Sequence, residues 1–251
     1  MKPTPLFSNI QTGAQTYDDI DKATYKGITI KTVLLFLITV AVALTTIFVV
    51  PRYVVATENM TPLLVGLIIA MIVALISALV GRLSYNLAMP FSIIYSLSMG
   101  FLLGFITEVA EEFVPGIAIT AVFATLIIFG IMLLLFFTGV IKPSRKLLGI
   151  GLGFLLGAIS LSLFTLIMAW TGVISLTAYL WLLLLIEAIY LIYAVVMLTF
   201  NFCEAVMVVN NGAIKKAEWS VALGLMSALA YIYVELLRIL LIIASIVGNN
   251  N

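Results

Sequence analysis

The chain has 251 residues, of which 64% are hydrophobic and only 9% are charged. Soluble domains carry about 25% charged residues, so this composition excludes a water-soluble globule and indicates an integral membrane protein. The formal net charge is +1 and no basic cluster alternates with aromatic residues, which excludes a nucleic-acid partner.

The chain begins with a polar segment and continues as seven apolar runs. Residues 1–31 are rich in Thr, Asp, Lys and Gly and cannot bury enough apolar surface to fold alone, so we expect a tail there. Each run is long enough to cross a hydrocarbon core of roughly 30 Å. The runs cover residues 32–50, 61–80, 88–106, 115–137, 148–170, 178–202 and 219–246. We therefore predict an all-α, integral membrane seven-transmembrane-helix bundle at 32–246, followed by a short tail at 247–251.

Proline, glycine and charged residues indicate where the first helices end. Pro51 and Arg52 are expected to stop the first helix, and Gly81 and Arg82 the second. Three acidic residues are expected to form a loop after the third run: Glu108, Glu111 and Glu112.

Glycines spaced along two runs predict close helix packing. Gly100 and Gly104 are four residues apart and share one face of the third helix, where a neighbouring backbone can approach. The fifth run is also glycine-rich and predicts tight contacts in the same way, at Gly149, Gly151, Gly153 and Gly157.

The basic residues are distributed unequally between the two sides of the membrane. With seven spans, the tail and the loops after spans two, four and six lie on one side and hold ten basic residues: Lys2, Lys22, Lys26, Lys31, Arg82, Lys142, Arg145, Lys146, Lys215 and Lys216. The connections on the other side hold only Arg52. By the positive-inside rule we expect the N-terminus inside the cell and the C-terminus outside.

Three charged residues lie inside the last two apolar runs. Inserting a charged side chain at the centre of a membrane costs at least about 2.5 to 3.5 kcal/mol of free energy. Such residues are therefore found where an ion-pair partner or a function compensates for that cost. Glu187 and Arg238 each lie roughly 12 to 14 Å below the outer ends of their helices, and Glu235 is three residues from Arg238. We therefore expect a cluster of Glu187, Glu235 and Arg238. It either fixes helix register as an ion pair, or responds to pH because the second carboxylate is available for a proton or a cation.

Other residue types exclude several functions. The sequence has no histidine, which removes imidazole relays and the usual hydrolase constellations, so we expect no enzyme activity. The single cysteine, Cys203, excludes a multi-thiolate metal site and is expected to be a small packing residue. No cofactor fingerprint occurs. Arg82 is expected to anchor the inner end of span two or to reach an acceptor on span six.

Several segments resemble a known family in the same order along the chain. They are 90–107, 114–125, 138–142, 211–219 and 231–238, together with Thr12-Gly-Ala and Thr24-Tyr-Lys-Gly in the tail. These segments are similar to the Bax inhibitor and YccA-like membrane family, in its bacterial branch. The resemblance implies a central seventh helix and a multi-pass protein of the bacterial cytoplasmic membrane.

The resemblance also implies a pH-sensitive calcium leak, governed in characterised relatives by two aspartates on the last two helices. The acid of the seventh helix corresponds to Glu235, whereas the aspartate of the sixth falls at Asn201, an amide that does not titrate. A glutamate that the family often shows in the third span is replaced by Met99. Two pairings therefore stay open for Glu235: with Asn201, as the family pattern implies, or with Glu187, as depth implies.

Two functions from different classes are compatible with these observations. In the first, the chain is a pH-responsive cation leak in which calcium is the permeant ion and no cofactor is bound. In the second, it is a non-conducting regulator that binds a membrane protease or another membrane protein through its tail. In both, the bilayer is the principal partner, and we expect a monomer or a weak oligomer.

Overall fold

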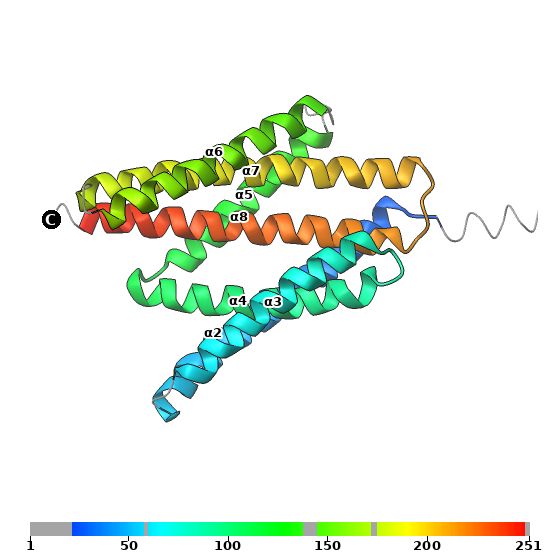
Figure 1. Ribbon diagram of the computed structural model, residues 1–251. Helices are drawn as coiled ribbons and strands as arrows, with labels where there is room; N and C mark the ends of the chain where they lie inside the picture. The colour runs from blue at the N-terminus through cyan, green and yellow to red at the C-terminus, as the bar shows by residue number, and fades with distance from the viewer. Residues whose placement is uncertain (1–21, 58–59, 138–144, 172–174, 249–251) are drawn as a thin grey trace, which may run out of the picture.

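The computed structural model describes residues 22–57, 60–137, 145–171 and 175–248. In these residues it contains seven helices, each long and apolar enough to cross a membrane, and only an isolated bridge in place of strands. The helices are α2 (Tyr25–Thr57), α3 (Thr61–Leu83), α4 (Ala88–Phe113), α5 (Ile117–Phe137), α6 (Arg145–Trp170), α7 (Leu176–Asn210) and α8 (Ala217–Gly248). The predicted all-α bundle of seven apolar spans is confirmed (Figure 1).

Successive helices run in opposite directions, so α2 begins and α8 ends at opposite ends of the bundle (Figure 1). We call the end where α2 begins the basic end. Its described side chains include Lys31, Arg82 and Lys216, and Lys216 donates to Asn86 at 3.0 Å across two connections. The assignment of this end to the inside of the cell stays a prediction.

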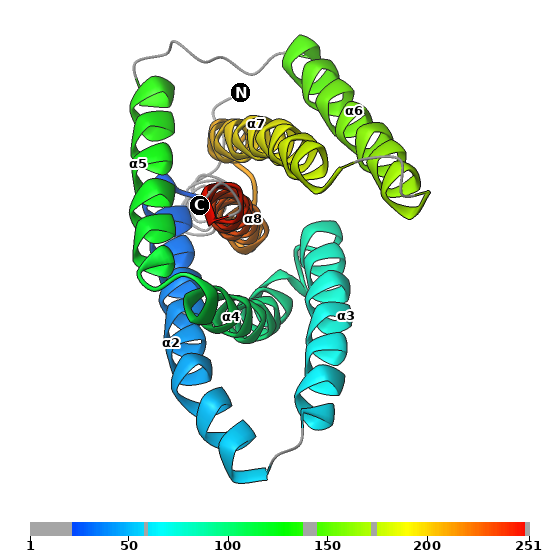
Figure 2. The same ribbon diagram turned by 90° about the vertical axis from the view of Figure 1, so that its left-hand side faces the viewer.

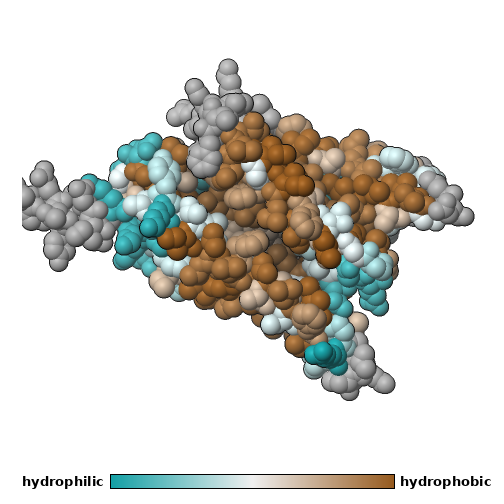
Figure 3. All heavy atoms as spheres, turned by 180° about the vertical axis from the view of Figure 1, so that it is seen from behind, coloured by the Kyte–Doolittle hydropathy of each residue, from teal (hydrophilic) through white to brown (hydrophobic). Residues whose placement is uncertain are grey.

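The surface carries the apolar belt that a bilayer requires. Figure 3 shows hydrophobic residues over the middle of one face and hydrophilic residues toward its two ends. Large apolar side chains are exposed along the helices, as at Ile68 and Leu75 of α3. Such a continuous apolar surface is stable only against lipid.

Helix α8 occupies the centre of the bundle. It packs against α2, α3, α4, α5 and α7, whereas α6 packs on α7 at the edge (Figure 2). Most of the basic-end half of α8 is buried, including Val221, Leu225 and Ile232, which join the largest apolar cluster. A side chain on α8 therefore meets protein rather than lipid on most sides.

Helix α4 lies directly on the backbone of α2, as its glycines predict. A methyl group added at Gly100 would lie 2.7 Å from the carbonyl oxygen of Thr39, and one at Gly104 would lie 2.6 Å from that of Ala43. The hydroxyl of Thr39 also donates to the carbonyl of Ser96 at 3.2 Å. The close approach at this glycine pair is confirmed.

The glycines of α6 do not behave in this way. Methyl groups added at Gly149, Gly153 and Gly157 would meet no atom within 4 Å, and the side-chain surroundings of Gly151 lie outside the described residues. The predicted tight contacts at the three described glycines are therefore wrong. The physical reason is the position of α6 at the edge of the bundle, where it packs on α7 but leaves open space beside these glycines, as in the pocket that Gly153 and Gly157 line with Ile189 of α7.

Two predicted helix ends are also wrong. Pro51 lies inside α2, which continues to Thr57, because a proline near a helix end removes only one hydrogen bond. The three glutamates expected in a loop lie in the last turns of α4. Glu111 accepts hydrogen bonds from the backbone amides of Gly116 at 2.5 Å and Ala118 at 3.0 Å, and so caps the start of α5. At the start of the chain, α2 begins at Tyr25, within the segment expected as a tail.

Candidate functional site

Three charged side chains meet between α7 and α8, in the half of the bundle away from the basic end. The Arg238 Nη2 atom lies 2.5 Å from Oε1 of Glu187, and its Nη1 atom lies 3.7 Å from Oε1 of Glu235. Glu187 is 2% exposed and Glu235 1%, whereas the Arg238 side chain is 49% exposed. The cluster expected from depth along the two helices is therefore present; we call it the triad.

Each carboxylate of the triad keeps one oxygen without a partner. Oε2 of Glu187 and Oε2 of Glu235 are buried and accept no hydrogen bond. Burying a carboxylate oxygen in this way is unfavourable, because the hydration it loses is not replaced. Two acids share one arginine, so a proton or a cation would complete the charge balance of the triad.

Three tyrosines of α7 and α8 lie together next to the triad, and one of them is beside Glu235. Tyr231 lies one turn before Glu235 on α8 and interacts with its carboxyl group. Tyr193 of α7 packs edge-on against Tyr231, with ring centroids 6.3 Å apart, and Tyr190 lies nearby. The two carboxyl groups lie close enough to repel each other when both are charged. Glu235 thus has an uncharged hydroxyl group beside it as well as the charged Arg238.

A second charged cluster lies nearer the basic end. Arg82 of α3 donates from Nη1 to Oδ1 of Asn201 at 3.0 Å, and its Nη2 atom lies 2.5 Å from Oε2 of Glu204. Both acceptors are on α7, which confirms that Arg82 reaches an acceptor on span six. We call these three residues the Arg82 cluster. The sequence argument did not single out Glu204, although its position three residues after Asn201 places both on one helix face.

The Arg82 cluster rests on a glycine of α8. A methyl group added at Gly224 would lie 2.6 Å from Oδ1 of Asn201 and 2.7 Å from Nη1 of Arg82. Gly224 and Glu235 are 11 residues apart in the sequence, which corresponds to roughly 16 Å along the helix. Asn201 therefore lies at a different level from Glu235, and the pairing of Glu235 with Asn201 implied by the family pattern is wrong.

A third cluster, unforeseen from the sequence, fixes the start of α2 to the start of α8. Glu218 is 1% exposed, accepts from the backbone amide of Thr24 at 2.8 Å and from its hydroxyl at 3.1 Å, and forms an ion pair with Lys31. A methyl group added at Gly27 would collide with the Glu218 carboxylate. We call Glu218, Thr24 and Lys31 the Glu218 cluster. Its sequence signal is the acid directly before Trp219, whose ring lies 5.2 Å from the Lys31 ammonium.

Two further features considered in the sequence are metal-binding groups and the single cysteine. No group of three or more His, Cys, Asp or Glu residues there is placed to hold a metal ion. Cys203 is 1% exposed and packs in the interior, which confirms its interpretation as a small packing residue.

Comparison with known proteins gives one match that covers nearly all of the chain. The family model described as Bax inhibitor 1 like matches residues 4–245. No curated protein and no solved structure matches the chain.

Proposed function

We propose that this chain, which belongs to the Bax inhibitor 1 like family, is a membrane pathway that leaks calcium or a similar cation in response to pH. The observation that supports the proposal is the triad. Two buried carboxylates share one arginine, and each retains an unpartnered oxygen at membrane depth. A structural ion pair needs only one acid for one base. Burying the second acid is unfavourable in free energy, and a role in function would explain why it is present.

In this proposal Glu235 takes up the proton and Arg238 is its local counter-charge. With both carboxylates ionised the triad has a net charge of −1, and one proton makes it neutral. Glu187 retains the shorter contact with Arg238, so protonation weakens the longer contact of Arg238 with Glu235 first. The groups that face Glu235 are Glu187, Arg238 and Tyr231, and Tyr190 and Tyr193 lie beside Tyr231.

The unpartnered oxygens suit a hard cation. Calcium takes oxygen ligands from carboxylates, and two such oxygens are available at the triad. One pocket between α2, α3 and α4 and another beside Gly153 and Gly157 of α6 are lined by residues outside the triad. In this proposal α7 and α8 move relative to each other when an ion passes, and the Arg82 cluster joins α3 to the same pair of helices.

Flux measurements on reconstituted vesicles test the proposal. The wild-type chain is expected to pass calcium at a rate that depends on pH, and Glu235→Gln is expected to abolish that dependence because an amide does not titrate. The matched control is Glu112→Gln, which changes an exposed acid at the end of α4 and is expected to keep the wild-type pH profile. An unchanged pH profile in the Glu235 variant would refute the assignment.

The second candidate is a non-conducting regulator that binds a membrane protease or another membrane protein. It is favoured by the attachment of the end of the tail to the bundle, where the amide of Ala23 donates to the carbonyl of Ala213 at 2.7 Å beside the Glu218 cluster. Deletion of residues 1–20 separates the two candidates. The leak predicts that calcium flux depends on the triad and tolerates this deletion, whereas the regulator predicts loss of cellular activity with no effect of Glu235→Gln.

A further inference from the structure

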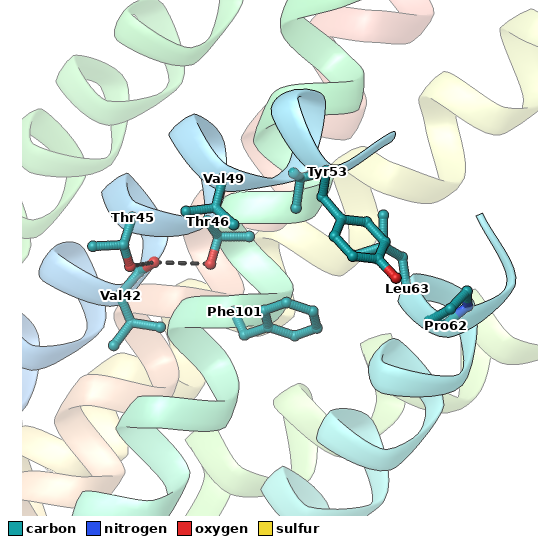
Figure 4. A pocket seen from close by; sticks show the side chains of 9 residues that line it. Val42, Thr45, Thr46, Val49, Tyr53, Pro62, Leu63 and Phe101 are labelled. Atoms are coloured by element: carbon teal, nitrogen blue, oxygen red, sulfur yellow. Dashed lines mark hydrogen bonds between the residues drawn. The ribbon is translucent and has the colours of Figure 1, made fainter. Parts of the chain in front are cut away.

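A pocket lies between α2 and α3, at the end of the bundle opposite the basic end, and its rim includes the exposed apolar side chain of Val49. These helices follow one another in the chain, yet each packs on α4 and they diverge on either side of it (Figure 2). The pocket between them has a volume of about 380 Å³, within the range of ligand pockets. Figure 4 shows the lining side chains, among them Thr46, Val49 and Tyr53 of α2, Pro62 and Leu63 of α3, and Phe101 of α4.

The lining of this pocket favours hydrocarbon. The hydroxyls of Thr45 and Thr46 both donate to the carbonyl of Val42 at 2.8 Å, so their protons are already used within α2. The Phe101 ring lies beside Gly66 of α3, where an added methyl group would be 3.8 Å from the ring, so Gly66 itself places no side chain against the ring. An occupant gains from this pocket by apolar contact rather than by hydrogen bonds.

The length of the pocket matches one leaflet of a bilayer. Its lining on α2 runs from Val42 to Tyr53, which is roughly 16 Å of helix, about half of a hydrocarbon core of roughly 30 Å. The molecules that reach such a lateral opening are the lipids of that leaflet. One acyl chain that runs parallel to α2 therefore fits the pocket from the membrane interface to its floor.

A single positive charge marks the interfacial end of the pocket. Arg52 directly precedes Tyr53, is exposed, and forms no ion pair with another described residue. It lies in the last turns of α2, and the other charged residues that the sequence places at the ends of helices on this side are the acids Glu58, Glu108, Glu111 and Glu112. A phosphate group at this end of the bundle is attracted to Arg52 and repelled by the glutamates of α4.

We propose that this pocket binds one acyl chain of an anionic phospholipid, whose phosphate lies at Arg52. The site is separate from the triad and does not depend on the proposed leak. The acyl chain fills the space between the two consecutive helices α2 and α3. It contacts both of them and α4.

Photolabelling in vesicles tests the proposal. The full chain is reconstituted in phosphatidylcholine vesicles that contain a small fraction of phosphatidylglycerol with a diazirine on its acyl chain, and labelled residues are mapped by mass spectrometry. Bulk lipid labels side chains according to their exposure, so Leu75, which is 63% exposed on the lipid face of α3, serves as the reference. A resident chain labels the less exposed Phe101 more strongly than Leu75.

Three variants complete the experiment. Val49→Trp fills the pocket from its rim and is expected to remove the excess label at Phe101, whereas Val33→Trp, at a similarly exposed site on the other half of α2, is expected to leave it unchanged. Label at Leu75 shows that each variant is inserted.

The role of Arg52 is tested by changing the lipid headgroup. With phosphatidylcholine as the probe, label at Phe101 is expected to be about fivefold weaker, which is the ratio expected for one basic residue at an anionic headgroup. Arg52→Gln is expected to remove this difference between the two lipids. Label at Phe101 no stronger than at Leu75, or unaffected by Val49→Trp, overturns the site, and equal label from both lipids overturns the role of Arg52.

Discussion

Arg238 makes its shorter contact with Glu187 on the neighbouring helix, at 2.5 Å, and a longer one of 3.7 Å with Glu235, three residues away on its own helix. The guanidinium therefore joins α7 to α8 and does not merely neutralise an acid on the same helix. Because Arg238 is half exposed while both acids are buried, the arginine also connects two enclosed carboxylates to the surface of the bundle.

Replacing Arg238 tests this arrangement. Arg238→Gln leaves two buried carboxylates without a cation, and we expect a loss of about 3 kcal/mol, at the lower end for a buried pair because the arginine is half exposed. The loss is expected to shrink as pH falls, because protonation removes the unpaired charge. Thermal unfolding in detergent at several pH values measures it. Adding Glu187→Gln to this variant should restore part of the stability, and a double variant no more stable than the single one contradicts the shared arginine.

The sequence alone predicted the spans and the triad because both depend on one coordinate, depth along a helix. Glu187 and Arg238 lie at the same depth in adjacent apolar runs, so antiparallel packing of the last two helices brings them together. The family pattern, by contrast, linked Glu235 to Asn201 without regard to depth. The roughly 16 Å of α8 between the levels of Gly224 and Glu235 separates them.

Features that depend on which helices become neighbours were not predictable in the same way. The glycines of α4 and those of α6 have the same spacing, yet only α4 packs on another backbone there. Likewise Glu218 and Thr24 are 194 residues apart, and their contact requires α2 and α8 to begin at the same end of the bundle. A single sequence shows that a glycine or a glutamate is present, but it does not show which helix packs against that residue.

The two glycine sets give a direct comparison of packed and open faces. Gly104→Ala places a methyl group 2.6 Å from a backbone carbonyl of α2, and we expect a loss of about 1 to 3 kcal/mol because the backbone cannot move aside without separating the helices. Gly153→Ala meets nothing within 4 Å and is expected to be neutral or to stabilise by up to about 1 kcal/mol through helix propensity. Midpoints of thermal unfolding for both variants measure the difference. Equal losses would contradict the packing of α4 on α2.

The Arg82 cluster predicts an interaction between three helices. Gly224→Ala places a methyl group where Oδ1 of Asn201 and Nη1 of Arg82 now lie, so it is expected to displace both side chains and to destabilise the fold by about 1 to 3 kcal/mol. Arg82→Gln removes one of the displaced groups, and the glycine substitution is then expected to cost less. A double-mutant cycle of unfolding free energies measures this coupling. Strictly additive losses would show that Gly224 and Arg82 act independently.

The Glu218 cluster predicts local opening at the start of α2. Glu218→Gln keeps the size of the side chain but removes its charge, which weakens the ion pair with Lys31 and the hydrogen bonds from Thr24 at the helix N-terminus. Amide hydrogen exchange is therefore expected to rise in the first turns of α2, from Tyr25 onward, while the amides of α8 around Ile232 keep their protection. Glu112→Gln, at an exposed acid, is the control and should leave both regions unchanged. If Glu218→Gln leaves exchange at the start of α2 as slow as in the wild type, the turn that begins with Ala213 holds this segment without the carboxylate.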